Sequence, residues 1–446
     1  MLKNYLTLAL KVLRRKPFYT FISLFGISFT LMILLLLTAM MESIMGDNRP
    51  MSDRDRLVVA PTLRRLRVET DTSLVIDTVA MDNGTLRYDT TERYLDRTTS
   101  NSNNPMSYFF ADEYLRDFEE AENYTFVHTS SHVDGYLEGR KFSFAPYLVT
   151  ASYWEVFDFE FLHGEPFNAT AERDAEAVVV LTDRAANDYF GRADASVIGR
   201  EMILGADTYT VKGIVARPLS DSPIFSADVM MPITRMDPRE LTGRDLYGGV
   251  MAIFVARTPE RIPALKEEIR LFAENFQMPA EEFHNEIELG ASTYVEGIAQ
   301  FMLQENDPEK ALRRLFIPLT ILLLLFMALP LLNLVNLNIG RVQERRSEIA
   351  VRKAFGARSG DILAQFILEN IVLTLIGGVI GLGLGLLAIR YVNANDLLGI
   401  TRLASNGTVF LYFFLLILLF GFLSGILPAY RMSRTNVATA LRGSGQ

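Results

Sequence analysis

The sequence contains no cysteine and no Gly-Lys dipeptide. Without cysteine the chain forms no disulfide and has no thiol nucleophile, so a folded domain in it depends on its hydrophobic core. Without Gly-Lys it lacks the phosphate-binding motif of P-loop ATPases, and it also lacks the G-x-S-x-G of serine hydrolases. His128 and His132 do not form an H-E-x-x-H zinc motif, and the Ser and Thr between them favour a loop. We therefore expect no catalytic, cofactor or metal site.

Long apolar runs are what the sequence does contain. The four runs that approach or exceed the roughly 20 residues needed to cross a bilayer are 18–41, 315–339, 362–389 and 409–428. Lys and Arg without acidic residues precede the first run, and further basic groups lie between the second and third runs and after the fourth. Because such groups favour the cytoplasmic side, we expect both termini inside and the long segment between runs one and two outside.

The charge of the chain is divided in the same way. The whole chain has a net charge of −9, residues 1–41 have +5 and residues 311–446 have +8, so residues 42–310 carry −22. This acidic outer segment argues against nucleic-acid binding. It serves solubility alone or attracts cationic partners, and the sequence leaves both interpretations open.

The predicted organisation follows from these runs. Residues 1–17 form an amphipathic helix on the inner leaflet, since Leu2, Leu6, Ala9 and Leu13 recur at helical spacing among cations. The complete prediction is as follows: 1–17 cytoplasmic helix, 18–41 first span, 42–314 outer core domain, 315–339 second span, 340–361 cytoplasmic coupling segment, 362–389 third span, 390–408 short outer loop, 409–428 fourth span, and 429–446 cytoplasmic tail.

The outer segment has the mixed pattern of an α+β domain. Runs of β-branched residues predict strands, Ser/Asn-rich stretches predict loops, and a 3.6-residue period predicts helices. The predicted strands are Leu57–Val59, Ser73–Asp77, Ala177–Leu181, Tyr209–Val215 and Val250–Ala256; the predicted turn and loop are Met81–Thr85 and Arg97–Pro105; the predicted helices are Ala111–Asn123, a short helix capped by Asp183 that ends at Phe190, Ile262–Phe276, and a stretch from about Val295 that leads into the second span.

The third apolar run carries a glycine stripe. Gly377, Gly381 and Gly385 recur every four residues, which lets another helix approach closely. The partner helix belongs to the same chain or to a second copy. Glu369 lies in the same run, where an ionisable group is costly, and its role is not evident from the sequence.

The segment between the second and third runs is the most informative part of the chain. A cationic, partly apolar helix between two spans lies at the inner membrane surface, where a soluble partner can bind it, and Gly356 can end this helix in a left-handed cap. The alternative is a basic loop that only sets topology. The candidate residues for binding such a partner are Glu344, Arg345, Arg346, Glu348, Ile349, Val351, Arg352, Lys353, Phe355 and Gly356.

Three stretches of the chain resemble the MacB-like and FtsX-like permeases of ABC transporters. The coupling segment Glu348–Ala357 is the most specific, the basic end Leu427–Arg442 matches the family's tail, and the stretch from Val149 to Gly213 resembles its periplasmic core domain. With one span before the outer domain and three after it, the resemblance extends over essentially the whole chain. Some members fuse an ATPase to the permease, and no P-loop is present here.

The resemblance implies a membrane α-helical fold of four spans with a large α+β domain between the first and second, in the bacterial inner membrane. It implies a permease, not an enzyme, that passes ATP-driven motion to a periplasmic domain for export of peptides, antibiotics or lipid-linked substrates. ATP and Mg²⁺ would bind in a separate ABC ATPase. A second permease, the same or related, would complete the complex, and a periplasmic adaptor or outer-membrane channel is left open. The alternatives are a lipoprotein-extraction permease and a membrane-anchored receptor that signals inward.

Overall fold

A computed structural model of the chain describes residues 17–46, 48–80, 86–130, 132–218, 222, 224–305, 307–322, 359–395, 397–398 and 402–433, together with positions 324, 325, 328, 351 and 355. The chain divides into two compact units, each of which is described by itself. The first, the helical unit, contains Met1–Gly46, Leu219–Asp221 and Arg313–Gln446; the second, the outer domain, contains Asp47–Pro218 and Ser222–Leu312.

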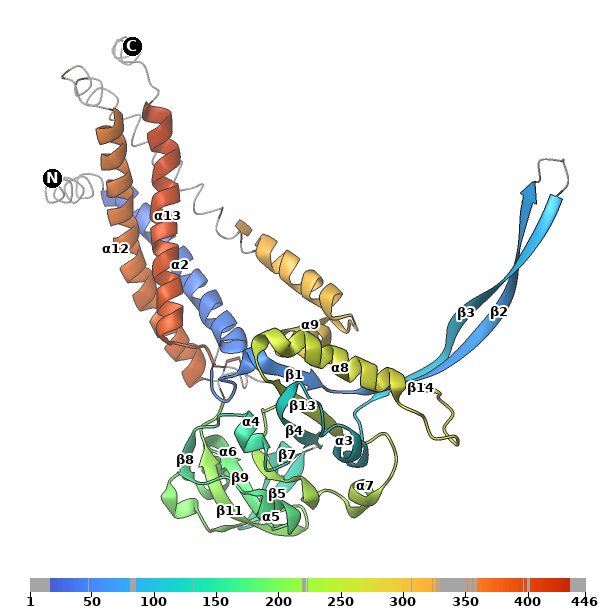
Figure 1. The fold of residues 1–446 in the computed structure, drawn as a ribbon. Coiled ribbons are helices and arrows are strands. Elements are labelled where there is room, and N and C mark those ends of the chain that lie inside the picture. The colour runs from blue at the N-terminus through green and yellow to red at the C-terminus, as the bar shows by residue number, and fades with distance from the viewer. Residues whose placement is uncertain are drawn as a thin grey trace. The chain divides into compact units, whose positions relative to one another are not determined.

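The helical unit has three long helices, α2 (Pro17–Met45), α12 (Ser359–Ala394) and α13 (Gly407–Ser433), which lie side by side in Figure 1. Their shared core is apolar, as helices with one buried stripe require. It includes Leu31 and Leu35 of α2, Leu373 of α12, and Phe413 of α13. Among the described residues, Leu24–Ile44 and Ile371–Ala394 are long and apolar enough to span a membrane, and Gly407–Leu419 is a shorter apolar stretch.

The predicted second span is described only in part. Residues 308–322 are helical, and 323–339 lie almost entirely outside the described residues. The helix α9 (Tyr294–Leu303) precedes this run and ends at Gln304, which has a left-handed φ of 53°. The helical stretch predicted from Val295 onward is therefore interrupted before 308.

The outer domain is built on one sheet, which has twelve strands among the described residues. Its order is β15-β1-β13-β4-β7-β12-β9-β11-β10-β5-β6, with β8 paired to β11. The strands are β1 (Leu57–Ala60), β4 (Ala121–Thr129), β5 (Val133–Leu137), β6 (Arg140–Phe144), β7 (Pro146–Val149), β8 (Phe161–Gly164), β9 (Val178–Thr182), β10 (Glu201–Leu204), β11 (Asp207–Val215), β12 (Val229–Pro232), β13 (Val250–Ala256) and β15 (Ser292–Thr293).

Short helices cover both faces of this sheet. They are α3 (Tyr108–Tyr114), α4 (Tyr153–Val156), α5 (Ala169–Arg173), α6 (Asp183–Phe190), α7 (Pro238–Thr242) and α8 (Ile262–Asn275), with the 3₁₀ turns η1 (Arg54–Arg56), η2 (Ala195–Val197), η3 (Ile233–Arg235) and η4 (Pro259–Arg261). Alternate residues of β9 enter different core clusters, Val179 and Leu181 on one face and Val180 on the other. Burial on both faces explains why this strand is a continuous apolar run.

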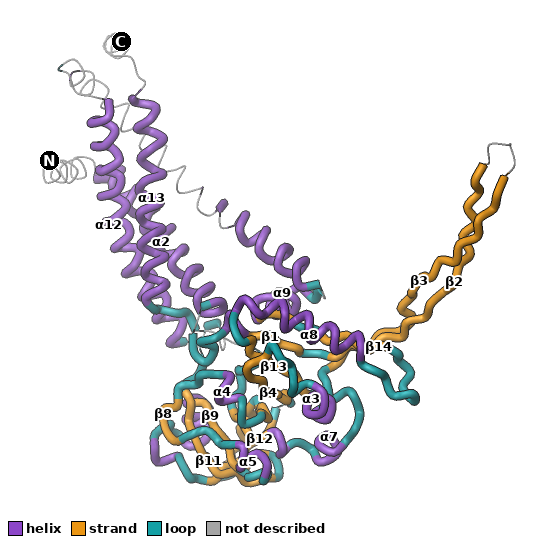
Figure 2. The backbone as a smooth tube through the Cα atoms, in the orientation of Figure 1, coloured by secondary structure: helices purple, strands orange, loops and turns teal. Residues whose placement is uncertain are grey.

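A second, three-stranded sheet has the order β14-β2-β3. It consists of β2 (Leu63–Ala80), β3 (Leu86–Asn104) and the short β14 (Glu286–Leu289). Figure 2 shows β2 and β3 as a long hairpin that extends away from the rest of the outer domain. The turn predicted at Met81–Thr85 lies outside the described residues.

Most sequence-based elements of the outer domain are confirmed. One predicted loop, the end of one predicted helix and the cap of another are wrong. The predicted loop Arg97–Pro105 is the end of β3, because its residues pair with the start of β2. The predicted helix Ala111–Asn123 stops at Tyr114, since Ala121–Thr129 is taken into the sheet as β4, between β13 and β7. The helix α6 is capped by the Thr182 side chain, which accepts from Ala185 N, and Asp183 is its first residue.

Candidate coupling site

Two positions of the predicted coupling segment are described. Val351 is helical and 49% exposed, Phe355 lies in a turn and is 89% exposed, and Phe355 N donates to Val351 O at 3.1 Å. The Phe355 ring therefore buries little of its apolar area within this chain. The coupling role of all ten candidates stays a prediction, and eight of them lie outside the described residues: Glu344, Arg345, Arg346, Glu348, Ile349, Arg352, Lys353 and Gly356. The same holds for the Glu369 side chain.

The three glycines of α12 face α2. A Cβ on Gly377 would lie 2.6 Å from the Ile27 side chain, one on Gly381 would lie 2.7 Å from the Ser28 carbonyl oxygen, and one on Gly385 would lie 2.5 Å from the Leu35 side chain. No ordinary Cβ contact is this short. The glycines therefore permit a close approach of α12 to α2 within one chain.

Polar contacts fasten the end of α2 to the segment between α12 and α13. Ala404 N donates to Ser43 Oγ at 2.7 Å, and Asn406 Nδ2 donates to Glu42 Oε1 at 3.0 Å. Asn393 holds the same segment by accepting from Leu403 N and donating to its carbonyl oxygen. These contacts hold together the end of α2, the end of α12 and the start of α13. No local sequence signal could have revealed them, because the partners of Glu42 and Ser43 are more than 360 residues away.

In the outer domain, the two strands nearest to the membrane connections are hydrogen-bonded to each other. The strand β1 follows α2 in the chain, and β15 leads directly into α9. They pair antiparallel, with Val58 opposite Thr293 and Val59 opposite Ser292, and β1 also pairs with β13 along its length. The strand that follows α2 and the strand that precedes α9 are thus adjacent at one edge of the sheet.

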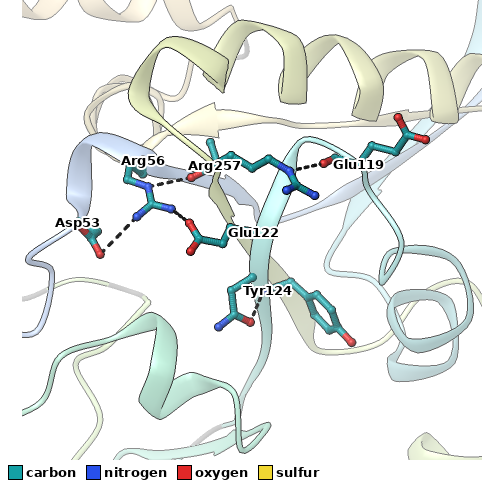
Figure 3. A network of polar contacts seen from close by, with 8 residues as sticks. Asp53, Arg56, Glu119, Glu122, Tyr124 and Arg257 are labelled. Carbon is teal, nitrogen blue, oxygen red and sulfur yellow. Dashed lines mark hydrogen bonds and ion pairs between the residues drawn. The ribbon is translucent and has the colours of Figure 1, made fainter.

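Arg56 fixes the start of β1 to its neighbours (Figure 3). Its Nε donates to Ala256 O at 2.8 Å, its Nη2 contacts the Glu122 carboxylate, and its Nη1 lies 3.8 Å from Asp53 Oδ2. Arg257 makes a similar bond to Glu119 O at 2.8 Å. The guanidinium groups thereby tie η1, β4 and β13 together, mainly through hydrogen bonds to carbonyls, since exposed ion pairs alone contribute little.

The start of α9 is fixed by a capping box. Thr293 and Glu296 satisfy each other's backbone N–H groups, and Glu296 also contacts Lys266 Nζ of α8. Burial raises the pKa of Glu296, but the hydrogen bonds from Lys266 and Thr293 outweigh burial and leave the pKa below its ordinary value. The T-x-x-E signature was present in the sequence and would have identified this helix start.

His128 was expected in a loop, and the structure places it in β4. Its ring is buried, and Nε2 lies 3.0 Å from Glu240 Oε2 of α7. Burial lowers the pKa of His128, and the Glu240 carboxylate opposes this effect without cancelling it. The described residues contain no cluster of three or more acidic or His side chains that could hold a metal.

We expect a His128→Gln variant to lose less stability in acid than the original chain. Because the folded-state pKa of His128 lies below the unfolded value, His128 contributes full stability above about pH 6.5, and this contribution is lost as the pH falls through the folded-state pKa. The Tm of the original chain should therefore fall further on acidification than the Tm of the variant. Thermal unfolding at pH 7.5 and 5.5 checks this, and an equal drop in Tm for both proteins would contradict it.

The single tryptophan reports on the outer domain in such experiments. Trp154 lies in an aromatic cluster, with ring centroids 5.7 Å from Phe159, 5.4 Å from Phe161 and 5.4 Å from Phe167. Its ring is partly buried and packs against the hydrophobic core of the outer domain.

The fold thus joins apolar, membrane-length helices to an acidic α+β domain, which is the architecture of a membrane protein with an extracytoplasmic domain. Residues 20–271 match the model of the MacB-like periplasmic core domain, and residues 320–437 match that of the FtsX-like permease C-terminal region. The chain belongs to the MacB/FtsX-like family of ABC transporter permeases.

Three relatives illustrate the similarity. The permease YknZ of Bacillus subtilis is 38% identical over 116 residues, which is 25% of this chain and 27% of YknZ. The macrolide export protein MacB of Bdellovibrio bacteriovorus is 26% identical over 287 residues, covering 63% of this chain and 41% of MacB. The pyoverdine export protein PvdT of Pseudomonas fluorescens is 25% identical over 288 residues, covering 64% and 41%. The chain spans less than half the length of these relatives.

Among solved structures, the periplasmic region of MacB from Actinobacillus actinomycetemcomitans aligns with a TM-score of 0.33 and 15% identity, covering 45% of this chain and 84% of that one.

Proposed function

We propose that this chain is the permease subunit of an ABC-type export complex and transmits the movement of a separate ATPase to its outer domain. Family membership supports the permease role. The lack of any Gly-Lys dipeptide in these 446 residues supports the assignment of ATP and Mg²⁺ to a partner subunit. A second permease, either a copy of this chain or a relative, completes the complex.

The proposed topology has four spans in the bacterial inner membrane, with both termini and the coupling segment inside. The distribution of Lys and Arg along the chain supports it. In this arrangement the segment that contains Val351 and Phe355 docks on the ATPase, and residues 47–312 face the periplasm.

The pairing of β1 with β15 carries this proposal. Motion of the coupling segment 340–361 reaches α12 because the two are consecutive in the chain, and α12 contacts α2 through its glycines. The helix α2 continues into β1, and the helical run 308–322 follows from β15 and α9. Since β1 and β15 share backbone hydrogen bonds, displacement of either connection moves the same sheet edge.

Export of peptides, antibiotics or lipid-linked molecules from the periplasm is the proposed use. Its support is the function for which the relatives are named, macrolide export for MacB and pyoverdine export for PvdT.

A flexible Gly-Ser insertion after Gly46 tests the transmission. The chain has no cysteine, so a spin label at Ala206→Cys is unique in each copy and reports the distance between two outer domains. Without the insertion, we expect this distance to change when the co-purified ATPase binds ATP. With the insertion, ATP hydrolysis should persist while the change is lost, because a flexible linker cannot transmit displacement.

The matched control is the same insertion between Glu138 and Gly139, in the exposed turn that joins β5 to β6. It should leave both hydrolysis and the distance change intact. A distance change that survives the insertion after Gly46 would show that motion does not travel through α2 into β1.

A further inference from the structure

The long hairpin is the part of the outer domain that the proposed function leaves without a role. The strands β2 and β3 have 18 and 19 residues, whereas β14 covers only Leu63–Leu66. Every described side chain over 69–72 and 94–99 is exposed. Figure 1 shows the hairpin extending well past β14.

The base of the hairpin is held firmly by the segment around β14. Arg64 Nη1 bonds Glu288 Oε2 at 2.8 Å, and Arg65 Nη1 bonds Glu282 Oε2 at 3.0 Å. The Arg65 guanidinium also stacks 3.6 Å from the centre of the Tyr247 ring. These contacts therefore fix the orientation of the hairpin relative to β14 at its base.

One contact at the base shows which backbone groups of β2 point outward. Val68 N donates to Asn285 Oδ1 at 2.8 Å, and Asn285 Nδ2 donates to Val68 O at 2.8 Å, so the Asn side chain substitutes for a neighbouring strand. Outward groups alternate along a strand, and no bulge interrupts β2 after Val68. Thr70, Thr72 and the following even positions therefore present their N–H and C=O groups at this edge. Among the described residues, β2 pairs over 70–80 with no strand except β3.

This edge lacks the features that usually prevent strand pairing. Residues 63–80 contain no Pro, Gly or Lys, and 70–80 contain only two charged residues, Asp71 and Asp77. A two-stranded ribbon is also marginally stable by itself. Both facts indicate that another strand completes the ribbon.

We propose that the outer edge of β2 pairs antiparallel with the same edge of β2 in a second copy of this chain, centred on Val75. Pairing of identical edges about a two-fold axis forms a closed dimer. The proposal rests on the proposed function only for the presence of a second copy in the complex.

The carboxylates select this register. If the two-fold axis passed through Asp71 or Asp77, that carboxylate would lie opposite the same carboxylate of the second copy. If the axis passed through Ser73, Asp77 would lie opposite Glu69, and if it passed through Leu74, Asp77 would lie opposite Asp71. Like charges directly opposite each other destabilise a sheet.

A two-fold axis through Thr72 would require Val68 to pair with Ile76 of the second copy. The outward N–H and C=O groups of Val68 are already hydrogen-bonded to the Asn285 side chain. A centre at Ile76 gives a shorter ladder. A centre at Val75 pairs Thr72 with Thr78 and Leu74 with Ile76, and it leaves each Asp opposite an uncharged residue. Charge and length thus favour Val75.

The test is disulfide formation in native membranes of the full chain. In the proposed register Val75 faces its own copy in a non-hydrogen-bonded pair, with a Cα separation of about 4.5 Å that suits a disulfide. A Val75→Cys variant should form a covalent dimer under mild oxidation. Val79→Cys is the matched control on the same strand and face, and it should not, because its partner is Asp71.

Co-expression of Val79→Cys with Asp71→Cys chains should restore the covalent dimer and confirm the register. Equal dimer yields for Val75→Cys and Val79→Cys, no dimer for Val75→Cys, or a Val75→Cys crosslink to a different protein would overturn the proposal. ATP hydrolysis measured in the same membranes separates the two claims. If Val75→Cys gives no covalent dimer but the permease still stimulates ATP hydrolysis, the hairpin contact is refuted and the proposed permease function is not.

Discussion

A Phe355→Asp substitution is expected to abolish stimulation of the partner ATPase while the protein still inserts into the membrane. The Phe355 ring is 89% exposed one helical turn after Val351, so its loss costs the chain itself little. Aromatic anchors at interfaces commonly contribute about 2 kcal/mol or more, and a carboxylate placed in the same contact adds a desolvation penalty. We therefore expect ATPase affinity to fall by about 30-fold or more.

The measurement is ATP hydrolysis by the purified complex, together with the amount of ATPase that remains bound after gentle extraction. Phe355→Leu is the control, because it keeps an apolar side chain and should retain most of the binding. Trp154 fluorescence verifies that the outer domain is folded in each variant. Unchanged stimulation in Phe355→Asp would refute the role of this residue.

A Gly381→Leu substitution is expected to separate α12 from α2. A Cβ at this position would lie 2.7 Å from the Ser28 carbonyl oxygen, which belongs to the backbone and cannot rotate away. Overpacking costs about 1–3 kcal/mol even where side chains can adjust, and here a helix must move. We expect the Gly381→Leu variant in detergent to lose its helical circular-dichroism signal at a lower Tm than the original chain, and to lose ATPase coupling.

Gly383→Leu provides the comparison on the same helix. A Cβ at Gly383 meets no atom within 4 Å, so the substitution should be tolerated and should stabilise the helix by about 0.5–1 kcal/mol through reduced backbone freedom. Equal melting temperatures for the two variants would mean that α12 and α2 do not pack through Gly381.

The elements that the sequence predicted well are those whose pattern is local. The apolar β9 and β13 and the periodic α8 were recognised because burial of one or both faces is visible in adjacent residues. The helix predicted over Ala111–Asn123 failed beyond Tyr114, since the pairing of β4 with β13 overrides the local preference of its acidic residues for a helix.

The contacts that make up the candidate site depend on residues far apart in the chain. The hydrogen bond from Ala404 N to Ser43 Oγ and the pairing of β1 with β15 join segments that share no sequence pattern. The glycines of α12 were visible in the sequence, whereas their partner, α2, was not. The first strand of the hairpin was predicted in part, at Ser73–Asp77. Its second strand was missed, because the Ser- and Asn-rich end of β3 is typical of loops and forms a strand only by pairing with β2.

The most direct test of the account is the side of the membrane on which position 351 lies. In the cysteine-free chain, Val351→Cys is a single reactive site, and Ala206→Cys marks the outer domain. We predict that an impermeant thiol reagent added to spheroplasts labels Ala206→Cys but not Val351→Cys, and that inside-out vesicles give the opposite result. Labelling of Val351→Cys from outside would contradict the account, because no ATPase could then bind the segment that carries Phe355.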